Sequence, residues 1–168
     1  MVDPTKFLDA GVHLHGHTCE AMLLGLRAGA AAMNRLGAER SAEAELLAVL
    51  EVGKDERGRC VADGVQTVTG CTLGKGNVQL LLGAPLSLTL VDRATRRAVR
   101  VTARVDASST PTDDAAADAL RLLRAPERRL LSVSEEFEYR PRTGGDGARA
   151  ERIDTELTAV KAARKRGR

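Results

Sequence analysis

Residues 18–37 of the chain read TCEAMLLGLRAGAAAMNRLG, and this stretch predicts a long helix. Thr18 is a favourable N-cap residue, Glu20 places an acidic side chain in the first turn, and Gly37 is typical of a helix end. The apolar residues in between recur at helical spacing. The run of small residues over 28–32 indicates that another backbone can pack closely against this helix.

After this helix, short apolar runs and alternating patterns predict a sheet. Residues 41–53 are expected to form a short helical lead-in followed by a strand, because the apolar run is short and meets Gly53. Two alternating segments on either side of a turn over 92–95 predict a β-hairpin. The other expectations are a helix over 60–68, a loop over 71–77, strands over 78–82, 85–91, 98–105 and 130–139, and a helix over 112–124 that is capped by Thr112 or Asp113 and stopped at Pro126. These elements predict an α+β domain.

The composition fits one globular domain with an aliphatic core. The chain has 168 residues, of which 43% are hydrophobic and only 2% aromatic, so Leu, Val and Ala must fill the interior. The scarcity of aromatic rings also argues against proteins that bind nucleic acids by stacking on the bases.

Positive charge is concentrated at the C-terminal end. Residues 142–168 hold eight Lys and Arg against four Asp and Glu. Since the whole chain carries a net charge of +3, a net charge of −1 remains for residues 1–141. The Gly-rich segment 143–147 reads as a linker, so we expect a domain over 1–141 and a flexible basic tail over 142–168. A surplus of positive charge that is confined to a tail weakens the case for a DNA-binding surface on the domain.

The cysteine content and the N-terminal segment indicate a soluble protein of a reducing compartment. The chain has three cysteines, an odd number, and residues 1–10 lack the apolar segment of a signal peptide. No stretch stays apolar and uncharged for the length of a membrane span. We expect a cytoplasmic location, where cysteines more often bind metals or react than form disulfides.

All three histidines fall within residues 13–17, and Cys19 follows two residues later. We expect an extended strip over 13–17 in which His13, His15 and His17 share one face, with the alternative that His13 only lines the strip. Cys19 would lie in the first turn of the long helix, where the dipole favours a thiolate. Zinc prefers this mixture of imidazole and thiolate, so the cluster predicts a transition-metal site.

A second group of candidates lies in residues 60–77. If residues 60–68 are helical, a rise of about 1.5 Å per residue separates Cys60 from Cys71 by roughly 14 Å or more, too far for one ion in one subunit. Cys60 would lie at a helix start, as Cys19 does, so we pair these two. Cys71 would serve a second site, a partner subunit or only the core.

Polar residues near these cysteines add further candidates. Residues 74–77, Gly-Lys-Gly-Asn, lack the full phosphate-binding loop pattern, so we expect Lys75 to overlook a cofactor site rather than to hold a nucleotide. Asp63 and Gln66 would lie on neighbouring turns of the second helix. They could orient metal-ligating groups through hydrogen bonds, or be an ordinary pair on a helix face.

Three ordered motifs resemble those of the FmdE (or FwdE) family of formylmethanofuran dehydrogenase components. They are His15-Gly16-His17-Thr18-Cys19, Cys60-Val61-Ala62-Asp63 with Gln66, and Thr69-Gly70-Cys71-Thr72-Leu73-Gly74-Lys75-Gly76-Asn77. The resemblance covers about residues 7–140. It implies an α+β fold with helices packed on a mixed β-sheet, like the family's core domain and domains of the glyceraldehyde-3-phosphate dehydrogenase type. It also implies dimerisation, a bound metal and a role beside molybdenum or tungsten enzymes of one-carbon metabolism.

The chain departs from the family pattern in three places. Glu20 follows the first cysteine where members often have Pro, and Gly64 replaces the usual Ala. The Cys-x-x-Cys zinc finger that many members carry near the C-terminus is missing, and the basic tail stands in its place. These departures bear on the partner more than on the metal.

The sequence therefore predicts a metal-binding protein. Its expected ligands are His15, His17, Cys19 and Cys60, with Cys71 and Lys75 lining a cofactor site. The expected metal is zinc or another first-row transition metal, in a homodimer that is accessory to redox or one-carbon metabolism, with a redox enzyme as partner. The alternative is a haem or iron–sulfur protein or enzyme that uses the same ligands. Enzymatic activity stays open, because Asp63 is the one candidate for a general base.

Overall fold

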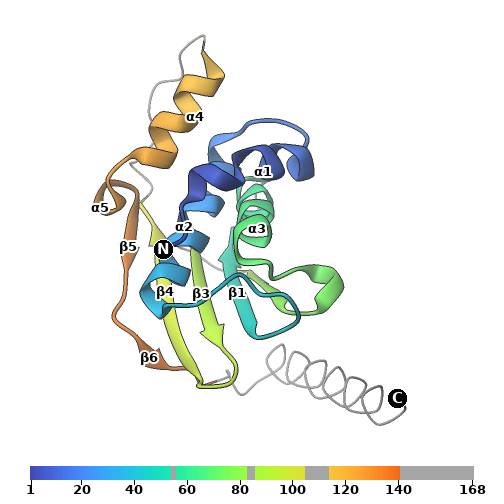
Figure 1. The fold of residues 1–168 in the computed structure, drawn as a ribbon, viewed down its shortest axis with the longest axis vertical. Coiled ribbons are helices and arrows are strands. Elements are labelled where there is room, and N and C mark those ends of the chain that lie inside the picture. Colours follow the sequence, from blue (N-terminus) through green and yellow to red (C-terminus); the bar gives the residue numbers. More distant parts are fainter. Residues whose placement is uncertain (54–55, 83–85, 105–113, 141–168) are drawn as a thin grey trace.

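The computed structural model of the chain describes residues 1–53, 56–82, 86–104 and 114–140. Its elements in chain order are η1 (Pro4–Phe7), α1 (Leu8–His15), α2 (Glu20–Leu36), β1 (Leu46–Val52), α3 (Glu56–Thr69), η2 (Leu73–Lys75), β2 (Val78–Leu82), β3 (Ser87–Asp92), β4 (Arg97–Ala103), α4 (Ala115–Arg124), α5 (Glu127–Leu130), β5 (Leu131–Val133) and β6 (Phe137–Glu138). Figure 1 shows α2 and α3 beside the sheet, α1 packed on these two helices, and α4 reaching beyond the sheet. No helix of the described ranges is long and apolar enough to cross a membrane.

The sheet is mixed, and β1 lies in its interior. Leu50 of β1 lies opposite Leu80 in the parallel strand β2 and opposite Leu88 in the antiparallel strand β3. The strand order is β2-β1-β3-β4-β5, and β6 also pairs with β4. Because parallel neighbours need a long crossover connection, the chain passes through α3 between β1 and β2. The predicted hairpin is the β3–β4 pair. The α+β fold with a mixed sheet is confirmed.

The main core lies between α2 and one face of the sheet. Leu50 and Leu88 point to this face and are at most 1% exposed, as are Met22 and Leu26 of α2. Burial of each such side chain stabilises the fold by about 1.5–3 kcal/mol. The buried hydrophobic residues of the described chain are Ala, Val, Leu, Met and Cys, so the predicted aliphatic core is confirmed.

Helices α2 and α3 pack so closely that glycine is needed where they meet. A Cβ atom on Gly25 would lie 2.2 Å from the carbonyl oxygen of Val61, and one on Gly64 would lie 2.1 Å from that of Met22. One turn further along α2, a Cβ on Gly29 would meet Val68 and Thr69 of α3. The contacts advance in the same direction along both helices, so the helices run parallel and their N-terminal ends lie side by side. This is the close approach that the small residues of α2 predict.

The predicted extended strip over residues 13–17 is wrong. Residues 8–15 form α1, so His13 and His15 lie about 200° apart around a helix and cannot share a face with each other. Gly11 packs under α2, where an added Cβ would lie 2.9 Å from the sulfur of Met22. Tertiary packing therefore supports a helix of only eight residues, which is too short to show a periodic pattern.

Several predicted boundaries also differ. The N-cap of α2 is Cys19 rather than Thr18, and α3 begins at Glu56 rather than at Cys60. Residues 41–45 form no helical lead-in. The last predicted strand is two short ones, β5 and β6, because each pairs with a different part of β4. Helix α4 has Asp114 as its N-cap, whereas the predicted caps Thr112 and Asp113, like the linker and the tail, lie outside the described residues.

Candidate metal centre

A tight reversal of the chain brings the histidine and cysteine side chains together. Helix α1 ends at His15, and Gly16 follows in the left-handed region with φ of 93°, donating its N–H to the carbonyl of Val12 at 2.8 Å. Glycine adopts this conformation without steric cost. The next residues lead back along α1, so His17 and Cys19 arrive beside the His15 ring.

Cys19 begins α2 and places its sulfur at the helix N-terminus. Its Sγ accepts a hydrogen bond from the backbone N–H of Met22 at 3.4 Å and lies 3.4 Å from Nε2 of His15. The sulfur thus lies beside backbone N–H groups of the first turn of α2. The sequence predicts Cys19 within the first turn, whereas in the structure it is the N-cap residue.

His15, His17 and Cys19 form a group of side chains that could hold a metal ion. One donor atom from each of the three residues lies within 4.8 Å of the others. The rings of His15 and His17 are 4.7 Å apart at their centroids and tilted by 38°. Zinc ligands at about 2.0–2.3 Å from the ion are roughly 3.5 Å from each other in a tetrahedron. The Cys19–His15 separation of 3.4 Å matches this value, and His17 is exposed, so its side chain is not fixed by surrounding packing.

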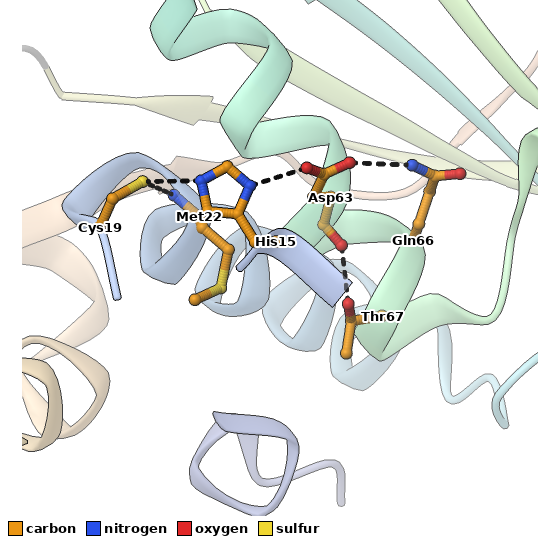
Figure 2. Close-up of polar contacts among 6 residues, drawn as sticks. All are labelled: His15, Cys19, Met22, Asp63, Gln66 and Thr67. Atoms are coloured by element: carbon orange, nitrogen blue, oxygen red, sulfur yellow. Dashed lines mark hydrogen bonds and ion pairs between the residues drawn. The ribbon is translucent and has the colours of Figure 1, made fainter. Parts of the chain in front are cut away.

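Asp63 of α3 holds the His15 ring from the other side. Its Oδ2 lies 2.8 Å from Nδ1 of His15, and Gln66 donates from Nε2 to its Oδ1 at 3.5 Å. Figure 2 shows Cys19, the His15 ring, Asp63 and Gln66 in one line of polar contacts. A carboxylate at Nδ1 leaves Nε2, which faces Cys19, free to bind a metal. The side chain of His15 is only 9% exposed, so the ring has little freedom to turn away.

Cys60 lies next to Cys19 rather than within the group of three. Burial, together with the charge and the hydrogen bond of the neighbouring Cys19 thiol, raises the pKa of the Cys60 thiol. Because α3 begins one turn earlier than the sequence predicts, Cys60 does not lie at a helix start. Its place beside Cys19 comes from the parallel packing of α2 and α3. Its role as a metal ligand stays a prediction.

A comparison with protein families finds one that covers this part of the chain. The model of the FmdE family, described as "FmdE, Molybdenum formylmethanofuran dehydrogenase operon", matches residues 14–138, a range that contains the cluster and the whole sheet. The chain belongs to the FmdE family.

Two individual proteins are similar to this FmdE family member. The first is an FmdE-like protein of the tungsten formylmethanofuran dehydrogenase type from Syntrophus aciditrophicus, whose crystal structure matches with a TM-score of 0.59 and 19% identity over 84% of this chain and 77% of that one. At this identity the likeness shows the fold. The second is a probable S-adenosyl-L-methionine-binding protein from Archaeoglobus fulgidus, 38% identical over 101 residues, which are 58% of this chain. The chain spans about a quarter (26%) of that relative's length.

The third FmdE motif lies at the opposite end of α3. Cys71 follows the last turn of the helix, is fully buried, and has a pKa that is raised by this burial. Lys75 donates from Nζ to the carbonyl oxygens of Ser41 and Ala42, at 2.9 and 3.3 Å. The structure thus places Cys71 in the hydrophobic core and the Lys75 ammonium at loop carbonyls, at the other end of α3 from Cys19. Their role in binding a cofactor stays a prediction.

Asn77, for which the sequence suggests no role of its own, completes the structure around the third motif. It is fully buried, and its side chain accepts from the N–H of Thr72 at 2.8 Å and donates to the carbonyl of Leu46 at 3.0 Å. The sequence signal for this role is an amide residue directly before an apolar strand. His13, by contrast, is exposed on α1 and takes no part in the group formed by the other two histidines.

Proposed function

We propose that this FmdE family member binds a transition metal through His15, His17 and Cys19, with Cys60 as the fourth ligand. The observation that carries the proposal is the convergence of three donor atoms within 4.8 Å, with His15 held by Asp63. Asp63 contacts Nδ1 of His15, and Gln66 donates a hydrogen bond to Asp63. These contacts fix the orientation of the ring, so that Nε2 points toward Cys19 without a bound ion.

The chemistry of the donors favours zinc or another first-row metal. Two imidazoles and two thiolates are a combination that zinc binds tetrahedrally, and such a site supplies no redox chemistry of its own. With Cys60 as the fourth donor, the four side chains would hold zinc as a structural ion and stabilise the fold. With His15, His17 and Cys19 alone as donors, the ion would be able to bind a water molecule or a thiol-containing ligand.

We further propose that the protein acts as an accessory protein in redox or one-carbon metabolism, as a homodimer and beside a redox enzyme. The metabolic role and the enzyme partner are supported by the family description, which refers to the formylmethanofuran dehydrogenase operon, and by the name of the similar protein from Syntrophus aciditrophicus. The homodimer is proposed from the resemblance of the sequence motifs to the family. Sedimentation equilibrium of the purified chain tests the dimer, and co-purification from cells that express a molybdenum or tungsten enzyme tests the partner.

Elemental analysis combined with a visible absorption spectrum tests the metal site. We expect one colourless metal ion per chain in the untagged protein and its loss in the His17→Ala/Cys19→Ala double variant. A Cys71→Ser variant is the matched control and should keep its metal. A strong visible band would instead favour the haem or iron–sulfur alternative. Negligible metal in all three proteins would contradict the proposal.

A further inference from the structure

Cys19 is the N-cap of α2, and Cys60, in the second turn of the parallel helix α3, lies beside it. Their placement does not depend on one contact alone. Arg57, one turn before Cys60, lies 3.7 Å from the carboxylate of Glu20, the residue that follows Cys19. Asp63, three residues after Cys60, reaches His15, whose Nε2 is 3.4 Å from the Cys19 sulfur. Contacts on both sides of Cys60 in the sequence, from Arg57 and from Asp63, therefore join its part of α3 to residues next to Cys19.

Both thiols are accessible to small reagents. Cys19 and Cys60 are each only partly buried, whereas Cys71 is fully buried. Cys71 is also separated from Cys60 by nearly the whole length of α3. The helix holds the two apart by roughly 14 Å from residue 60 to residue 69 alone, and a disulfide needs Cα atoms within about 7 Å. Of the three cysteines, only Cys19 and Cys60 are placed to bond to one another.

We propose that Cys19 and Cys60 form a reversible disulfide that controls whether the site can hold its metal. The control of metal binding rests on the proposed function, because it assumes that both sulfurs are ligands. Oxidation would consume both thiolates and leave His15 and His17 as the remaining ligands, too few for a stable zinc site. Reduction would restore the four donors.

The reaction balances with a low-molecular-weight disulfide such as oxidised glutathione as the oxidant. One cysteine thiolate attacks the reagent, which releases one thiol and leaves a mixed disulfide on the protein. The second cysteine attacks that protein sulfur, the Cys19–Cys60 bond forms, and the second reagent thiol leaves. The protein loses two electrons and two protons in total, and the reagent disulfide gains them as two thiols.

The test begins with metal-free, fully reduced protein that is incubated with oxidised glutathione. We expect two of the three thiols to disappear, with a mass loss of two hydrogens and no lasting glutathione adduct. After digestion with trypsin without reduction, the peptide 7–27 should be linked to the peptide 60–75. Since the second peptide contains both Cys60 and Cys71, fragmentation must place the bond on Cys60. A bond to Cys71, a bond between two chains, or a stable adduct on either cysteine would overturn the proposal.

A Cys60→Ser variant provides the control. The zinc content of the protein provides the second readout. The variant should keep a glutathione adduct on Cys19 and form no internal bond. Oxidised wild-type protein should lose its zinc on gel filtration and regain it after treatment with dithiothreitol. If the oxidised protein retains its zinc, the control of metal binding is overturned although the disulfide stands. If reduced protein binds no zinc, the proposed function and the control fall together, and the peptide map still decides the disulfide.

Discussion

The cysteine motifs at the two ends of helix α3 differ in their exposure and in the partners of their polar side chains. At the N-terminal end, Cys60 and Cys19 are partly exposed, and the donor atoms of His15 face sulfur and carboxylate groups. At the C-terminal end, Cys71 is fully buried, and the polar side chains around it, such as Asn77, are bonded to backbone groups.

This difference separates a site from a structural network. Backbone N–H and C=O groups that are buried must find partners, and the side chains of Asn77 and Lys75 provide them for backbone groups of Thr72 and of residues 41–46. The donor atoms of His15, His17 and Cys19 instead lie close to one another, so that an ion could bind between them. The N-terminal cluster is therefore where we place function, and the C-terminal network is where we place fold stability.

Metal-dependent stability should show the largest effect. Zinc at about 1,000 times its dissociation constant should stabilise the folded protein by about 4 kcal/mol, because it binds only the folded state. Denaturant unfolding with zinc and with a chelator measures this difference. It should vanish in Cys19→Ser and persist in Cys71→Ser. Equal losses in both variants would remove the distinction between the two ends of α3.

Loss of the buried amide at the C-terminal end should affect folding and not metal binding. We expect Asn77→Ala to lower the free energy of unfolding by about 3 kcal/mol, since it leaves the N–H of Thr72 and the carbonyl of Leu46 without partners. Asn34→Ala is the matched control, because its bonds to Val2 are exposed. Urea unfolding of the metal-free proteins measures both, and zinc affinity of folded Asn77→Ala should equal that of the wild type. A metal-free variant as stable as the wild type would contradict the role of Asn77.

Removal of the carboxylate behind His15 should weaken the metal site without abolishing it. We expect Asp63→Ala to reduce zinc affinity by about 10- to 100-fold, as is typical when the partner of a ligating histidine is removed. Competition with a chromophoric chelator measures the change. Gln66→Ala, one contact further away, should lose less. An unchanged affinity in Asp63→Ala would show that Asp63 does not position His15.

The smallest effect should be a dependence of stability on pH at Glu45, in the loop beside the C-terminal network. Backbone hydrogen bonds and the hydroxyl of Ser41, at 2.8 Å, hold the pKa of this carboxyl below its ordinary value of 4.5. A lowered folded-state pKa means that the contribution is present above the unfolded pKa and is lost as the pH falls through the folded one. Glu45→Gln should therefore be slightly less stable than the wild type at pH 7, with the difference shrinking below pH 4.5. A difference that is constant with pH would rule out this linkage.

Much of the fold and part of the site could be predicted from the sequence. The hairpin could be predicted because alternating apolar residues face the core, and α2 could be predicted because its apolar residues recur at helical spacing over a long stretch. Helix α1 was missed because it is held by the contact of Gly11 with α2, which no local pattern shows.

In the site, local spacing was enough to group His15, His17 and Cys19. The hydrogen bond between His15 and Asp63 joins residues 48 positions apart. It depends on the packing of α1 against α3, which are far apart in the sequence. The sequence could propose Asp63 as a partner of a ligand, but only the packing determines which ligand it contacts.

The most direct test of the central claim is the absorption spectrum of the protein with cobalt(II) in place of zinc. We predict intense bands of a tetrahedral ion and a thiolate-to-cobalt charge-transfer band, which Cys71→Ser leaves unchanged and Cys19→Ser weakens. The same spectrum in wild-type protein and in Cys19→Ser, or the spectrum of the free ion in both, would contradict a metal site at His15, His17 and Cys19.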